Sequence, residues 1–143
     1  MQRAAGALAL VALLCAGCGS SVTRPRVEQA LATTFTNLYV QQQEQAGRTE
    51  VSVPGLGTTA SCARRSGGEG PGGDWACRLQ FTAYDTPTSW VYELEVHPDG
   101  CFRADGPPDA GPEAFVDEIT GARTPNALFQ FDGCFDPSLG ARP

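Results

Sequence analysis

Apolar side chains recur with a helical period between residues 26 and 46. They fall at positions i, i+4, i+8 and i+11, which places them in one stripe along a helix. The stripe is made of Val27, Leu31, Phe35 and Leu38, and the opposite, polar face carries Gln41, Gln43 and Glu44. The apolar pattern predicts an amphipathic helix over residues 26–46. We expect its first turn to begin slightly earlier, at Thr23 or Arg24. Pro25 is tolerated in its first turn, and Gly47 is a natural stop.

Further along the chain, apolar and polar residues alternate, which is the period of a β-strand. One alternating run has Trp75, Cys77, Leu79 and Phe81 on a single face, and the next has Trp90, Tyr92, Leu94 and Val96. We expect a turn at residues 85–88 between these two strands. Residues 97–100 read His-Pro-Asp-Gly, which favours a type I turn before a third strand that begins at Cys101. Residues 59–64 predict one more strand, followed at 66–73 by a loop too rich in glycine to have a fixed shape of its own.

The rest of the chain carries weaker signals. Residues 105–112 form a loop rich in proline, glycine and aspartate. Residues 112–120 predict a short helix with Phe115 and Ile119 facing inward and Gly121 as its stop. A last strand or extended segment returns to the sheet and contains Phe129, Phe131 and Cys134.

These elements predict a single α+β domain over residues 27–136, followed by a tail at 137–143. The expected architecture is one N-terminal helix packed on an antiparallel sheet of about four or five strands, with two disulfides. The stripe of the helix would cover the one apolar face of the sheet.

The first residues of the chain have the plan of a secretory signal. Arg3 precedes an apolar stretch at 4–14, which is too short for a bilayer span of roughly 20 apolar residues. The stretch leads into Cys-Ala-Gly-Cys-Gly-Ser at residues 15–20, which resembles the lipobox of bacterial lipoproteins. The resemblance implies cleavage before Cys18 and a lipid on its sulfur. It departs from the usual pattern because Cys15 stands where leucine is common.

We therefore expect residues 1–17 to be a lipoprotein signal peptide and residues 18–26 to be the lipidated cysteine and a short tether. The expected location is the cell membrane, with the domain exposed on the extracytoplasmic side. The alternative is an ordinary secreted protein with a cysteine near its cleavage site.

Four cysteines lie beyond the signal, and an even number in a small exported domain predicts two disulfides. Cys62 and Cys77 flank the glycine-rich loop on adjacent strands, so a hairpin brings them side by side. The remaining pair, Cys101 and Cys134, would tie the C-terminal segment to the third strand. A zinc site would need short Cys-x-x-Cys or Cys/His spacing, which does not occur among these four cysteines. We predict no metal and no other cofactor.

The charge of the chain bears on its partners. It has 16 acidic residues against 10 basic ones, and all of the basic ones are arginine. An acidic protein is a poor match for nucleic acid, whose affinity rests on cations that meet phosphates. We expect no nucleic-acid partner.

Several motifs together resemble a family. These are the helix, the cysteine hairpin with Trp75 before its second cysteine, the Pro-Asp-Gly-Cys-Phe turn at 98–102, and the closing Asn-Ala-Leu-x-x-Phe-Asp-Gly-Cys-Phe at 126–135. The chain resembles small exported cysteine-containing lipoproteins of high-GC, actinobacterial-type bacteria, which carry a domain of unknown function. The resemblance implies a location and a fold and brings no activity with it.

No catalytic constellation stands out in the sequence. His97 is the only histidine and lies in a predicted turn before proline, as a solvated residue. Glu93 and Glu95 lie two apart on a strand, so both point to one solvated face, with Arg78 as an expected cross-strand partner. A loose acidic cluster lacks the spacing of a calcium loop: Asp105, Asp109, Glu113, Asp117 and Glu118.

Trp75 and Trp90 occupy core positions of the alternating strands, which favours packing in the sheet over a role in lining a ligand groove. The function hypothesis is a non-enzymatic, membrane-anchored lipoprotein of the cell envelope that serves as an interaction or ligand-binding module. Its partners would be the membrane, through the lipid on Cys18, and an unknown envelope protein or small ligand. The alternative is a cystatin-like protease-inhibitor domain, because a helix on an antiparallel meander is similar to that plan. An enzyme is the third and least supported hypothesis.

Overall fold

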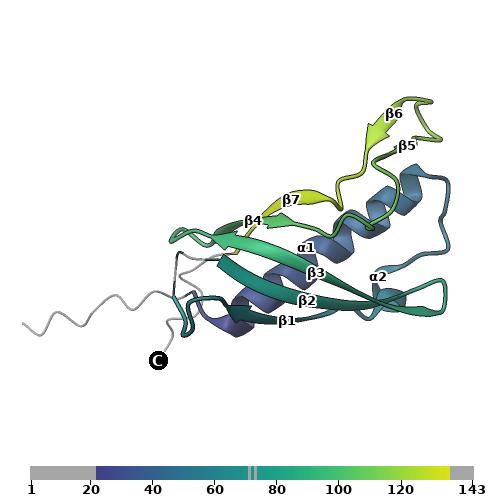
Figure 1. Cartoon of the computed structure of the whole chain (residues 1–143). Helices are drawn as coiled ribbons and strands as arrows, with labels where there is room; N and C mark the ends of the chain where they lie inside the picture. Colours follow the sequence, from purple (N-terminus) through teal and green to yellow (C-terminus); the bar gives the residue numbers. More distant parts are fainter. Residues whose placement is uncertain (1–21, 71, 73, 136–143) are drawn as a thin grey trace, which may run out of the picture.

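A computed structural model of the chain describes residues 22–70, 72 and 74–135. The predicted signal peptide, Cys18 and the tail at 137–143 lie outside the described residues. One long helix packs on a five-stranded antiparallel sheet, with a small two-stranded sheet beside it (Figure 1). The α+β prediction is therefore confirmed.

The helix α1 (Arg24–Gln45) has the predicted stripe of buried side chains. Its buried residues are Val27, Ala30, Leu31, Phe35, Thr36, Tyr39 and Gln43. Pro25 lies in the first turn, where its missing N–H would have no helical partner. Val22 is 1% exposed and belongs to the core, so the packed structure begins before the helix. The helix begins at Arg24, as predicted, so Arg24 to Arg26 belong to the helix and not to the tether.

The main sheet is a meander closed by a strand from the C-terminal part of the chain. Its strands are β1 (Thr59–Arg64), β2 (Asp74–Ala83), β3 (Thr86–Val96), β4 (Cys101–Asp105) and β7 (Gln130–Cys134), paired in that order. A short helix, α2 (Val53–Leu56), precedes β1. The small sheet pairs β5 (Ala114–Val116) with β6 (Arg123–Pro125), and both lie in the connection from β4 to β7.

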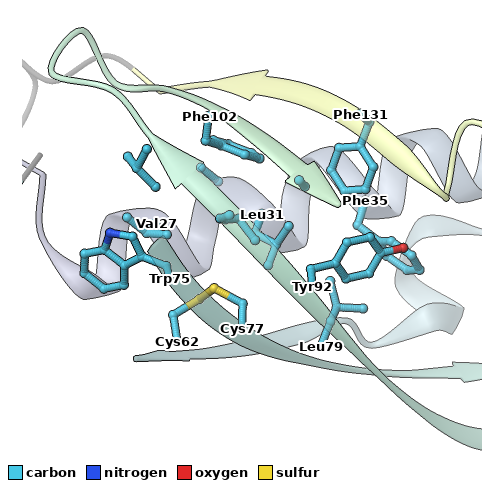
Figure 2. Close-up of a cluster of buried hydrophobic side chains, with 14 of the residues drawn as sticks. Val27, Leu31, Phe35, Cys62, Trp75, Cys77, Leu79, Tyr92, Phe102 and Phe131 are labelled. Carbon is cyan, nitrogen blue, oxygen red and sulfur yellow. A yellow bond between two sulfur atoms is a disulfide. The ribbon is translucent and has the colours of Figure 1, made fainter. Parts of the chain in front are cut away.

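The core lies between α1 and the apolar face of the sheet, where the alternating positions of β2 and β3 meet the helix stripe (Figure 2). Trp75, Leu79 and Tyr92 are fully buried there. The ring of Phe35, from the helix, packs against the ring of Tyr92. Burying one such large apolar side chain stabilises the fold by about 1.5–3 kcal/mol.

The turn between β2 and β3 differs from the prediction at residues 85–88. The two-residue turn consists of Tyr84 and Asp85, with φ of 50° and 58°. Positive φ at both residues gives the backbone the twist that a two-residue hairpin needs. Thr86 and Pro87 are already in β3, opposite Ala83 and Thr82. Proline is tolerated at this point because β4 pairs with β3 only from Glu93 onward, leaving this stretch at the edge of the sheet.

The helix predicted over residues 112–120 is wrong. The segment is a hairpin, and Ile119, expected to face inward, is 79% exposed. The side chain of Asp117 accepts hydrogen bonds from the backbone N–H groups of Ile119 (2.8 Å) and Thr120 (2.9 Å), which turns the chain back on itself. An aspartate that bonds its own downstream backbone favours a turn over a helix interior.

Both predicted disulfides are confirmed, as Cys62–Cys77 and Cys101–Cys134. In each case the two cysteines lie directly opposite each other on neighbouring antiparallel strands. The first staples β1 to β2 inside the core, and the second ties β7 to β4.

The two disulfides differ in access to solvent. Cys62 and Cys77 are 4% and 0% exposed, whereas Cys134 is exposed and Cys101 half-buried. Because exchange needs a thiol or phosphine to reach sulfur, we expect mild reductant to open Cys101–Cys134 first. Timed reduction, alkylation and peptide mapping would check this order. Reduction of both bonds at equal rates would contradict it.

The long helix and the main strands run along the domain, and their termini and connecting turns lie at its two opposite ends (Figure 1). One end holds the start of α1, the described part of the glycine-rich loop and the turn between β3 and β4. The described part of that loop is fixed by neighbours, since the N–H of Gly70 donates to the carbonyl of Val22 (3.0 Å) and that of Gly72 to Val96 (2.9 Å). The other end holds the end of α1, the turn of Tyr84 and Asp85, and the β5–β6 hairpin. We call these the N-terminal end and the far end.

Candidate functional site

A cavity of about 250 Å³ lies at the far end, between the last turns of α1, Trp90 of β3 and the connection from β4 to β7. We call it the far-end pocket. From α1 and the segment after it come Tyr39, Gln42, Gln43, Ala46 and Arg48; the other walls are Trp90, Asp109, Ala110, Gly111, Pro112, Phe115, Asn126 and Leu128. Apolar and polar side chains thus meet in one concave surface, as in most small-molecule sites.

Two neighbouring glutamines of α1 line this pocket, in opposite states. Gln43 is 6% exposed, and its Oε1 accepts hydrogen bonds from the hydroxyl of Tyr84 (2.6 Å) and from Arg48 (3.1 Å). Gln42 has a buried Oε1 with no hydrogen-bond partner among the described residues. An unpaired buried acceptor costs about 1–3 kcal/mol, so the protein gains free energy if the Gln42 side chain turns its Oε1 toward a donor in the pocket.

Trp90 forms an aromatic wall. It is half-buried and packs edge-on against Phe35 (5.8 Å between centroids) and Phe81 (5.0 Å). Trp75 instead is fully buried in the core and does not line the pocket. The prediction of core packing therefore holds for Trp75, while Trp90 belongs to the core edge and to the pocket at once.

The wall opposite α1 is irregular backbone held by buried hydrogen bonds. The amide of Asn126 donates to the carbonyls of Ala110 (3.1 Å) and Pro112 (3.0 Å) and accepts from the N–H of Leu128 (2.9 Å). The hydroxyl of Tyr92 donates to the carbonyl of Leu128 (2.8 Å), and burial raises the pKa of Tyr92, which keeps it a donor. A satisfied buried network of this kind fixes the shape of the wall.

The β5–β6 hairpin supports the same wall. Hydrogen bonds from the backbone of Thr120 and then of Ile119 hold the pKa of Asp117 below its usual range, although partial burial acts the other way. The N–H of Glu118 donates to the carbonyl of Gln45 (2.7 Å), which attaches the hairpin to the end of α1. The hairpin therefore links both sides of the pocket.

The residues that the sequence offered as candidates for catalysis or metal binding do not form one site in the structure. His97 is exposed in the turn at the N-terminal end, where its carbonyl accepts from the N–H of Gly100 (3.1 Å). Glu93 is paired with Arg65 (2.5 Å) rather than with Arg78, whose side chain donates to Ser89 (3.4 Å). The register explains the error, because β2 presents Ala76 opposite Glu93.

The acidic cluster is dispersed. Asp105 lies on β4, Asp109 on the pocket rim and Asp117 in the hairpin turn. Among the residues that the structure describes, no group of three or more His, Cys, Asp or Glu side chains could hold a metal ion.

A second hollow of about 360 Å³ lies at the same end, between residues 50–56 and the turn of Tyr84 and Asp85. None of the described side chains that line it carries a buried polar atom without a partner, in contrast to Gln42 in the far-end pocket. We therefore regard the far-end pocket as the stronger candidate.

Sequence reasoning missed the glutamines. The helical stripe places Gln43 on the solvated face, and Gln42 gives no signal in a run of three glutamines. Asn126 has no sequence signal beyond its place in the closing motif at 126–135. Their roles depend on Tyr84 and on residues 110–112, which are distant in sequence, so no local pattern could have shown them.

Comparison with known proteins yields no relative: no protein-family model, no curated protein and no solved structure matches the chain. Within the described residues, no helix is both long and apolar enough to cross a membrane.

Proposed function

We propose that this chain is a non-enzymatic lipoprotein of the bacterial cell envelope, anchored by lipid on Cys18, whose domain binds a small ligand or an envelope partner at its far end. The observation that carries the binding role is the far-end pocket, which is lined both by the aromatic ring of Trp90 and by Gln42, whose buried Oε1 has no partner among the described residues. The anchoring role rests on the apolar stretch and lipobox-like sequence before Cys18.

The position of the anchor and of the pocket agree with this role. Cys18 precedes the buried Val22 by four residues, and four extended residues reach at most about 14 Å. A lipid on Cys18 would therefore hold the N-terminal end close to the membrane. The pocket lies at the opposite end of α1 and would face away from the bilayer.

The proposed function includes no catalysis. The reason is where the potentially reactive side chains lie in the fold. A Ser/His/Asp or Cys/His mechanism needs a histidine beside its nucleophile. The single histidine, His97, lies at the N-terminal end, and the four described cysteines are paired in disulfides.

The anchor is tested by partition of the protein between detergent and water. We expect wild-type protein expressed in a bacterial host to enter the detergent phase, because each buried methylene contributes about 0.8 kcal/mol and two or more chains hold a protein stably. Cys18→Ser should shift to the aqueous phase. Cys15→Ser is the matched control and should partition like the wild type. Wild-type protein found wholly in the aqueous phase would refute the anchor.

The cystatin-like alternative makes a different expectation, which is stoichiometric inhibition of a protease. Titrating the purified protein into a panel of proteases would separate the two. Tight inhibition by the wild type would replace the ligand-binding role by an inhibitory one.

A further inference from the structure

We infer that the far-end pocket binds one neutral pyranose ring, that is, a single sugar unit. This inference rests on the proposed ligand-binding role and names the class of the ligand. It follows from the apolar wall, the polar rim and the size of the pocket.

The apolar wall suits the flat face of a sugar ring. Trp90, Phe115 and Leu128 all line the pocket, and the first two are only half-buried, so part of each ring is free to contact a ligand. A pyranose carries its C–H bonds on its faces and its hydroxyls around its edge. Its faces can pack on aromatic carbon while its edge meets polar groups.

The polar rim offers planar groups that suit neighbouring hydroxyls. The amide of Gln42, the guanidinium of Arg48 and the carboxylate of Asp109 all line the pocket. A guanidinium or carboxylate presents two adjacent donors or acceptors, and each hydroxyl both donates and accepts. The buried Oε1 of Gln42 has no donor, and a hydroxyl in the pocket supplies one when the side chain turns toward it.

The charges of the rim favour a neutral ligand. Arg48 and Asp109 are both exposed and of opposite sign. A ligand with a net charge of either sign would gain from one of them and be repelled by the other. A sugar without acid or amine groups meets no such opposition.

The size limits the ligand to one ring. Sites for drug-sized ligands have volumes of about 300–1,000 Å³, whereas this pocket measures about 250 Å³. A planar aromatic side chain of similar size is the rival occupant. If it lacks a hydroxyl it leaves the Oε1 of Gln42 unpaired, so the sugar is the better match.

The test uses the full-length protein in a zwitterionic detergent, since glucoside and maltoside detergents carry a pyranose themselves. The sugar probes are methyl α-D-glucopyranoside, methyl α-D-mannopyranoside and methyl β-D-galactopyranoside. N-acetyl-L-phenylalanine amide, whose side chain has no hydroxyl, is the aromatic probe. Saturation-transfer NMR should show contact to the ring C–H protons of at least one sugar, with tryptophan fluorescence changing over the same concentrations.

The variant that decides the role of Gln42 is Gln42→Met. We expect it to weaken sugar binding by about tenfold or more, because the acceptor is lost. It should also raise the Tm of the free protein by about 2–8 °C, because a buried unpaired oxygen is removed. Gln41→Met, at an exposed helix position outside the pocket, is the matched control and should change neither quantity.

The outcomes separate the two proposals. If the aromatic probe binds and no sugar does, the sugar assignment is overturned while the ligand-binding role stands. If neither class binds, the ligand-binding role of the pocket fails as well. If a sugar binds equally to the wild type and to Gln42→Met, the pocket assignment is overturned.

Discussion

The Phe35→Ala variant is expected to lose about 3–5 kcal/mol of its free energy of unfolding. Phe35 is 0% exposed, and its ring lies within 4.9–6.1 Å, between centroids, of four other aromatic rings. These belong to Tyr39, Phe81, Trp90 and Tyr92. Truncation removes the helix side of this cluster and leaves a cavity that close-packed neighbours can fill only in part. Urea unfolding followed by circular dichroism would measure the loss.

Ile119→Ala is the control for this prediction. Ile119 was predicted to face inward, but it is 79% exposed at the tip of the β5–β6 hairpin. Its truncation should change the free energy of unfolding by less than about 0.5 kcal/mol. A larger loss for Ile119→Ala than for Phe35→Ala would mean that the hairpin, and not the helix–sheet interface, holds the core.

Removal of the disulfides should have effects of similar size. The Cys62–Cys77 loop has a sequence separation of 15 residues and the Cys101–Cys134 loop one of 33. Chain entropy then gives a loss of about 3 kcal/mol for the Cys62→Ala/Cys77→Ala pair and about 4 kcal/mol for Cys101→Ala/Cys134→Ala. Both are large against a total of roughly 5–15 kcal/mol for an ordinary domain.

Urea unfolding of the two double variants without reductant would measure these losses. Reductant is the internal control. It should lower the free energy of unfolding of the wild type below that of either variant without reductant, because the wild type then loses both bonds. Each variant should lose only the contribution of its one remaining bond. Losses under about 1 kcal/mol in both variants would contradict the assignment of stability to the closed loops. The second variant should also free β7, which the bond ties to β4.

The sequence alone determined the main architecture. The i, i+4, i+8, i+11 stripe and the alternating runs indicate which side chains are buried. Both periods are local properties of the chain. The helix, the four consecutive strands and the helix-covered face follow from them. The cysteine pairing could also be predicted from the sequence, because Cys62 and Cys77 flank a loop that brings the two strands of a hairpin together.

The tertiary structure alone decided the details that build the pocket. The i, i+4 spacing of Phe115 and Ile119 suits a helix, but hydrogen bonds to Asp117 turn that segment into a hairpin fixed to the end of α1. Gln43 belongs to the polar side of the sequence pattern, yet it is buried because Tyr84 supplies a donor from a turn 41 residues away. A periodic pattern records how strongly a side chain avoids water, whereas the burial of a polar group depends on which partners the folded chain brings to it.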